Sequence, residues 1–146
     1  MVSEQFKIAG IALITNLDEN LPQVKGNTYK FEQVILNLIL NSKDALLEKK
    51  RDLNELYPMF IKITTRCDSK KISIHVEDNG TGIKNEHRDK IFQPFYTTKE
   101  TGKGTGLGLS ISYGLIREIN GEIDIQSKVQ KGTIFSITLP LKPEKN

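Results

Sequence analysis

The sequence is poor in the features that mark secreted or membrane-spanning chains. It contains a single cysteine, Cys67, which excludes an internal disulfide and fits a reducing compartment. Its longest apolar stretches, IAGIALI and VILNLILN, are too short or too polar to cross a bilayer. The first residues carry no basic start before an apolar run, so no signal peptide is visible. We therefore expect a domain that makes no membrane contact.

The charge balance gives no indication of a nucleic-acid partner. The chain has 21 Lys and Arg against 18 Asp and Glu, and its net charge is only +3. No basic run is interleaved with aromatic residues, so nucleic-acid binding is not expected. Its 146 residues suit one domain with a proper core. We expect a single domain over residues 1–146, with its core at about 8–140 and a polar tail at 141–146.

Hydrophobic periodicity predicts an α/β fold. Two segments have helical spacing of apolar residues, at 28–51 and 107–119, and Gly121 is expected to close the second. Alternating or apolar runs predict strands at residues 8–17, 59–66, 71–76, 121–127 and 132–140. Residues 85–103 look polar and irregular. This order predicts a two-layer α/β sandwich, a mixed or mostly antiparallel sheet with helices on one face.

Glycine alternates along TGKGTGLGLS, residues 101–110, immediately before the second predicted helix. Backbone N–H groups bind phosphate best where no Cβ intrudes and where a helix begins, so this segment is a candidate phosphate loop. It is no Walker loop, because Gly104 follows Lys103 where Ser or Thr is required. It also lacks G-x-G-x-x-G spacing and a preceding strand. A flexible loop with a capping glycine is the alternative.

A carboxylate followed by two glycines, DNGTG, stands at the end of a predicted strand. Asp78 can accept a hydrogen bond from the exocyclic amine of adenine, while guanine would present a carbonyl there. Gly80 and Gly82 would let a flat ring lie against the backbone. Losing a hydrogen bond to a buried charged group costs roughly 1.5–3 kcal/mol, enough for useful discrimination. The alternative is an Asx-type turn, which DNG alone would form.

A polar stripe runs along the first predicted helix. Gln33, Asn37, Asn41 and Asp44 are spaced i, i+4, i+8 and i+11 among Ile and Leu residues. Amides in such surroundings need partners, which neighbouring backbone or water would supply. The functional interpretation is a face for a metal and phosphates, since Mg²⁺ takes oxygen ligands and the amide oxygen of Asn37 or Asn41 would fit.

Five motifs together resemble the catalytic, ATP-binding domain of sensor histidine kinases. QVILNLILNSKDAL resembles the N box, DNGTGI the G1 box, IFQPFYTTK the F box, GKGTGLGLSIS the G2 box, and GTIFSITLP the last glycine box and strand. Each motif alone is weak, but all five in order and at family spacing are highly specific. The resemblance covers the chain from about Ile14 to Pro140, within the superfamily of Hsp90 and type II topoisomerase ATPases. NSKDA and FYTTK look like the nitrogen-regulation branch.

The resemblance implies the Bergerat fold and a two-component signalling function. ATP and Mg²⁺ would bind between helices and a mobile lid at about residues 85–105. The γ-phosphoryl group would pass to a histidine on a dimerisation domain absent from this chain, with the receiver domain of a response regulator downstream. The domain would then be cytoplasmic, whether or not the whole sensor is anchored in a membrane.

The resemblance also carries roles to individual positions. It implies that Asn37 and Lys99 are catalytic, that Asn37 also contacts Mg²⁺, and that Phe92 and Phe95 anchor the lid. The residues implied to bind ATP are Asn37, Asn41, Asp44, Asp78, Gly80, Gly82, Ile83, Phe95, Thr98, Lys99, Gly104, Thr105, Gly106, Leu107, Gly108, Leu109 and Thr133.

Two features bear on the reaction. The ATPase relatives carry a water-activating glutamate at the position of Asn37, and an amide is a poor base, which favours phosphoryl transfer over hydrolysis. Neither His75 nor His87 is followed by the acidic residue usual after the acceptor histidine, so we expect the acceptor elsewhere. One departure is that Asp44 stands where many members carry lysine, while Lys43 comes one residue early.

Two alternatives stay open at this stage. An autonomous kinase of the same fold, acting on a serine of a protein partner, would suit the same N-box and G2 sequences. A nucleotide-binding regulatory module without catalysis would use binding only to order the lid.

Overall fold

The computed structural model describes residues 2–19, 21, 28–94 and 108–141. Nine elements follow one another in these residues: α1 (Val2–Ile8), β1 (Ala12–Asn16), α2 (Thr28–Leu53), β2 (Phe60–Cys67), β3 (Lys71–Asp78), α3 (Asn85–Arg88), α4 (Gly108–Glu118), β4 (Glu122–Lys128) and β5 (Gly132–Pro140).

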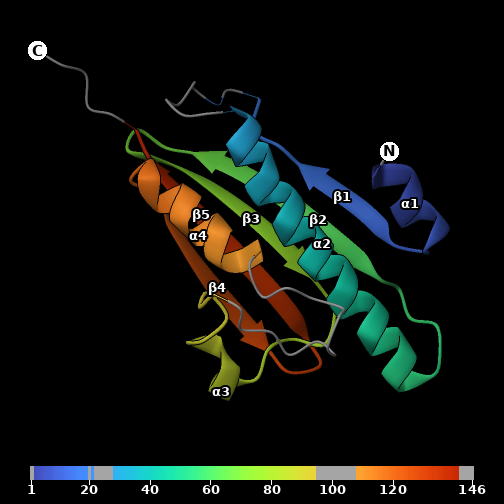
Figure 1. Ribbon diagram of the computed structural model, residues 1–146. Coiled ribbons are helices and arrows are strands. Elements are labelled where there is room, and N and C mark those ends of the chain that lie inside the picture. Colours follow the sequence, from blue (N-terminus) through green and yellow to red (C-terminus); the bar gives the residue numbers. More distant parts are fainter. Residues whose placement is uncertain (1, 20, 22–27, 95–107, 142–146) are drawn as a thin grey trace, which may run out of the picture.

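The strands form one mixed sheet in the order β1-β2-β3-β5-β4. β1 and β2 are parallel, and the other neighbouring pairs are antiparallel, including the hairpins β2–β3 and β4–β5. Helices α2 and α4 lie side by side across one face of the sheet (Figure 1). The predicted two-layer α/β sandwich, with a mixed sheet and helices on one face, is therefore confirmed.

Period-two burial on the central strands builds the core. On β3 and β5 every second residue is buried beneath the helices, and these rows meet Val34, Leu38 and Leu46 of α2 and Ile116 of α4. Each apolar row ends in one polar residue, Asp78 on β3 and Thr133 on β5, and the two are paired in register. The alternation thus carries two polar side chains into the helix-covered layer at one edge of the core.

The prediction of a strand over residues 8–17 is wrong at its start, because α1 precedes the shorter strand β1. The helix ends in a Schellman motif around Gly10, whose φ is 82°. Ile11 N–H donates to Phe6 O at 2.9 Å and Gly10 N–H to Lys7 O at 3.1 Å. Phe6 and Ile11 are both buried, which is the apolar contact typical of this motif.

The end of α4 differs in detail from the prediction. Asn120, with φ 61°, takes the left-handed position that was expected for Gly121. Gly121 N–H instead donates to Ile116 O at 2.9 Å, and a Cβ on Gly121 would lie 2.8 Å from side-chain atoms of Ile116 and Leu139. Close packing, rather than a positive φ, therefore requires this glycine. The segment predicted to be irregular from residue 85 begins with the one-turn helix α3.

Candidate functional site

The carboxyl group of Asp78 is the most perturbed acid in the described part of the chain. Its side chain is 3% exposed, and Gly80 N–H donates to its Oδ1 at 2.8 Å, so the Asx-type turn considered above does form. Desolvation raises the pKa of Asp78 to about 6, against the lowering effects of N–H groups at Gly80 and Thr133 and of the Ser42 hydroxyl. A strand-end turn does not by itself demand a buried carboxylate.

A buried hydroxyl on α2 lies beside this carboxyl. Ser42 is 1% exposed, and its Oγ makes no hydrogen bond of ordinary geometry with any described residue. It lies close enough to Asp78 to favour the ionised carboxyl. A buried hydroxyl without a hydrogen bond of ordinary geometry is costly, so a polar ligand or a water bound beside Asp78 would supply the bond that Ser42 lacks.

Thr133 is held by a small hydroxyl network. Its Oγ1 lies 2.9 Å from Ser127 Oγ, which also contacts Gly132 O at 3.0 Å and receives Ile83 N–H at 2.7 Å. This network joins the start of β5, the end of β4 and the loop after Gly82. Ile83 and Thr133 are predicted site residues, whereas Ser127 is not, because a serine in an alternating strand looks like any polar surface position.

Glycines let three backbone segments approach each other around Asp78. A Cβ on Gly80 would lie 2.8 Å from the backbone of Ala45 in α2. Gly82 has a φ of 73°, and a Cβ on it would collide with the Lys128 carbonyl. Gly132 has a φ of 130°, and a Cβ on it would collide with the Asp78 carbonyl. Close contact with protein backbone therefore accounts for these glycines, including Gly132, the first residue of the predicted last glycine box.

Asn37 joins the two helices at the other end of the predicted site. Its Nδ2 donates to Ser112 Oγ of α4 at 3.3 Å, and Ser112 is fully buried. A Cβ on Gly108, the first residue of α4, would lie 4.0 Å from Asn37 Oδ1. The amide thus stands beside the N-terminal turn of an 11-residue helix, where backbone N–H groups favour anions.

Some of the remaining predicted site residues are described by the structure, and the others lie outside the described residues. Asn41 and Leu109 are half-buried, whereas Asp44 lies on an exposed position of α2. The early lysine, Lys43, has its Nζ 5.8 Å from the centre of the Phe6 ring in α1. Seven predicted site residues lie outside the described residues: Phe95, Thr98, Lys99, Gly104, Thr105, Gly106 and Leu107.

A lysine that the sequence analysis did not consider ties α2 to the two turns around Asp78. Lys49 Nζ donates to Gln130 O at 2.9 Å and to Asn79 O at 3.3 Å, and it lies 4.9 Å from the Tyr57 ring centre. Burial and the neighbouring Asp78 charge raise the pKa of Tyr57 to about 12. Lys49 falls in a charged run at the end of the helix, so no local pattern distinguishes it from Lys50.

The segment after the G1-like motif is anchored at two points within its described part. Arg88 Nη2 in α3 donates to Ser127 O at 2.7 Å. The ring of Phe92, predicted to anchor the lid, lies 5.4 Å from the ring of Tyr113 in α4, centre to centre. The segment therefore leaves the sheet edge against β4 and reaches α4.

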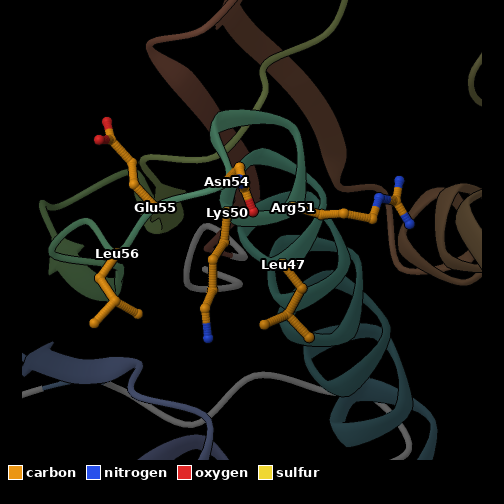
Figure 2. A pocket seen from close by; sticks show the side chains of 6 residues that line it. All are labelled: Leu47, Lys50, Arg51, Asn54, Glu55 and Leu56. Atoms are coloured by element: carbon orange, nitrogen blue, oxygen red, sulfur yellow. The ribbon is translucent and has the colours of Figure 1, made fainter.

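Both histidines and an open hollow lie apart from these groups. His75 Nδ1 is 2.8 Å from Ser136 Oγ on the sheet face opposite Asp78, and His87 is 3.6 Å from Glu86. A hollow of about 420 Å³ at the end of α2 contains none of the predicted site residues, as Figure 2 shows. It is lined by Leu47, Lys50, Arg51, Asn54, Glu55 and Leu56.

Across 2–19, 21, 28–94 and 108–141, no three His, Cys, Asp or Glu side chains gather as a metal site would require. No helix in that part of the chain has the length and apolarity needed to cross a membrane.

Comparison with known proteins gives consistent matches. Residues 26–143 match the family described as histidine kinase-, DNA gyrase B-, and HSP90-like ATPase. The chain is 42% identical over 123 residues to sensor kinase CckA of Brucella abortus, and 40% identical over 118 residues to two-component sensor PprA of Pseudomonas aeruginosa. These alignments cover 80% and 81% of this chain but only 13% and 12% of the two relatives.

A solved structure matches over nearly the whole chain. It is the nucleotide-free catalytic domain of histidine kinase ThkA, with a TM-score of 0.78 and 30% sequence identity. The match covers 97% of this chain and 87% of that domain. The present chain thus corresponds in extent to an isolated domain, and not to a whole sensor.

Proposed function

Because the chain belongs to the histidine kinase-, DNA gyrase B- and HSP90-like ATPase family, as the catalytic ATP-binding domain of a sensor histidine kinase, we propose that it binds ATP with Mg²⁺ and passes the γ-phosphoryl group to a histidine of a separate dimerisation domain. A response-regulator receiver domain would take the group next. The proposal places the domain in the cytoplasm, where ATP is available. The observation that carries it is the buried carboxyl of Asp78 beside the equally buried hydroxyl of Ser42, which lacks a hydrogen bond of ordinary geometry.

These groups fit the amino edge of adenine. The carboxylate of Asp78 accepts hydrogen bonds, and the exocyclic amine of adenine donates them. The Ser42 hydroxyl would gain a partner, either a ring nitrogen or a bridging water. Thr133 stands opposite Asp78 in the register and adds a second hydroxyl at the same edge. A base with a carbonyl at this position would leave the carboxylate unpaired.

The region around Asn37 fits the phosphates. With Nδ2 engaged by Ser112, the amide leaves its oxygen for a cation, and the adjacent N-terminal turn of α4 offers backbone N–H groups to anions. Magnesium, when bound, supplies positive charge that offsets the phosphate oxygens. Asn37 and Asn41 would hold it together with phosphate oxygens and waters, since the described residues provide no cluster of carboxylates.

The residues present favour transfer over hydrolysis. An amide at Asn37 cannot take a proton from water, so no general base stands at that position. A histidine nitrogen needs no such base, because its lone pair attacks the γ-phosphorus in line while the bond to the β-phosphate oxygen breaks and ADP leaves. His75 is engaged with Ser136 on the far face of the sheet, and His87 sits beside Glu86. The acceptor in this proposal therefore belongs to another domain.

Calorimetric titration of the chain with ADP and with GDP, both with Mg²⁺, tests the adenine pocket. We expect ADP to bind about 10- to 150-fold more tightly, since a carbonyl facing Asp78 forfeits a charge-assisted hydrogen bond. Equal affinities from a folded chain would contradict the pocket assignment.

The substitution Asn37→Asp tests the metal and phosphate end. In a full-length kinase carrying this domain, transfer of label from γ-³²P-ATP to histidine should fall at least about 100-fold. The aspartate would place a new negative charge facing the phosphates, and the hydrogen bond that Asn37 donates to Ser112 would be lost. Asn54→Asp, at an exposed position after α2, is the matched control and should keep full transfer. Label appearing on serine, or transfer unaffected by Asn37→Asp, would count against this mechanism.

A further inference from the structure

The hydroxyl of Ser127 makes three contacts at the edge of the proposed adenine pocket. Ile83 N–H donates to its Oγ at 2.7 Å, and the same oxygen lies 3.0 Å from Gly132 O and 2.9 Å from Thr133 Oγ1. Ser127 itself stands on β4, opposite Thr133 in the strand register. Ser127 thus contacts both the last residue of the G1-like motif DNGTGI and the Thr133 hydroxyl at the proposed adenine edge.

Counting hydrogens fixes the direction of these bonds. The Gly132 carbonyl can only accept, so Ser127 must donate its single hydroxyl hydrogen there. The Ile83 N–H occupies one acceptor position on Ser127 Oγ. The remaining contact is then satisfied only if Thr133 donates its own hydrogen to Ser127. Any other assignment leaves one of the three contacts without a hydrogen.

This arrangement turns Thr133 into an acceptor toward the pocket. Its only hydroxyl hydrogen points to Ser127, so its lone pairs are what remains for a ligand or bridging water. Asp78, paired with it in register, also offers only lone pairs once ionised. The edge then has two adjacent acceptors, 3% and 4% exposed, which suit an amine and repel a carbonyl.

We propose that Ser127 is a positioning residue for base selection: by holding the Thr133 hydroxyl hydrogen away from the pocket, it makes the site reject bases with a carbonyl at position 6. This inference rests on the proposed function, because it assumes that adenine binds against Asp78 and Thr133. Without Ser127 the Thr133 hydroxyl turns freely and donates to a carbonyl, so part of the discrimination is lost while Asp78 supplies the rest.

The test compares ADP with inosine diphosphate, whose base differs from adenine only in a carbonyl at position 6 and a proton on the adjacent ring nitrogen. Calorimetry on the whole chain gives the ratio of the two affinities. In Ser127→Ala we expect this ratio to fall at least about 5-fold, mainly through tighter binding of inosine diphosphate. Ser136→Ala, which removes a hydroxyl from the opposite face of the sheet, should leave the ratio unchanged.

A double-mutant cycle separates orientation of Thr133 from a general structural role. In a Thr133→Val background there is no hydroxyl to orient, so adding Ser127→Ala should no longer change the ratio. A purely structural role, through Ile83 for example, would weaken both nucleotides alike or persist in that background, and either result overturns the proposal. Ser127→Cys, with a weakly bonding thiol, replaces the alanine variant if that variant does not fold.

The two proposals fail in different ways. If the unaltered chain binds ADP and inosine diphosphate equally, the adenine pocket itself is wrong. If the unaltered chain prefers ADP and Ser127→Ala keeps the full preference, the pocket stands and only the role of Ser127 is refuted.

Discussion

Replacing Asp78 by asparagine should abolish ADP binding and at the same time stabilise the nucleotide-free domain near pH 8. The affinity should fall at least about 100-fold, because the variant loses a charged acceptor and presents an amide donor toward the donating amine of adenine. The melting temperature should rise by roughly 5 °C, because asparagine removes a carboxylate that is ionised in a desolvated position. Calorimetry and thermal unfolding measure the two effects on the same samples.

The pH dependence gives this prediction its sign. Burial raises the pKa of Asp78 from its ordinary value of 3.8 to about 6 in the folded domain, so the folded state holds the proton more tightly. Its contribution to stability is therefore complete below about pH 3.8 and is lost as the pH rises through about 6. A shift of this size corresponds to an upper estimate of about 3 kcal/mol. The advantage of Asp78→Asn should thus vanish near pH 4.

Asp124→Asn is the control for this experiment. Asp124 is exposed on β4 and pairs with Ser136, on the sheet face away from the helices. Its replacement should leave the ADP affinity unchanged. An Asp78→Asn variant that bound ADP normally, or that melted at the same temperature as the parent at pH 8, would show that the carboxylate is not the buried recognition group described above.

Replacing Gly132 by alanine should strongly destabilise the folded domain. A Cβ at this position would collide with the Asp78 carbonyl, and φ of 130° is a conformation that alanine rarely adopts. We expect the free energy of unfolding to fall by about 3 kcal/mol or more, as strain at the residue adds to displacement of β5 from β3. Urea denaturation measures this directly, and ADP binding should weaken with it.

Gly114→Ala is the matched control for the added methyl group. Gly114 lies within α4, and nothing stands within 4 Å of the position that its Cβ would occupy. Alanine should therefore raise stability by about 0.5–1 kcal/mol, since glycine is a poor helix residue. Two Gly→Ala changes would then act in opposite directions. If Gly132→Ala were as stable as the parent chain, the close approach of β5 to the Asp78 carbonyl would be wrong.

Local sequence predicted much of the frame because its signals are periodic. The spacing of Val34, Leu38 and Leu46 placed a long helix against a core, and alternation along β3 and β5 placed buried rows on one face. That same alternation put Asp78 at a strand end, where the structure finds it buried. The start of the chain was misjudged because Gly10 was treated as part of an apolar run, although F-x-x-x-G-I carries the signature of a helix end.

Sequence by itself therefore determined the layers, the order of the five strands and two long helices, the family and the acid that faces the proposed base. Tertiary structure decided which hydroxyl groups and which lysine form hydrogen bonds around Asp78 and Asn37. Ser112 meets Asn37 across 75 positions, and Lys49 reaches Gln130 across 81. Ser42 and Ser127 likewise gain their importance from neighbours on other elements. The physical reason is that hydrophobic periodicity indicates only which face of an element a residue occupies. A hydrogen bond also requires that the fold bring a donor and an acceptor from distant segments within about 3 Å of each other.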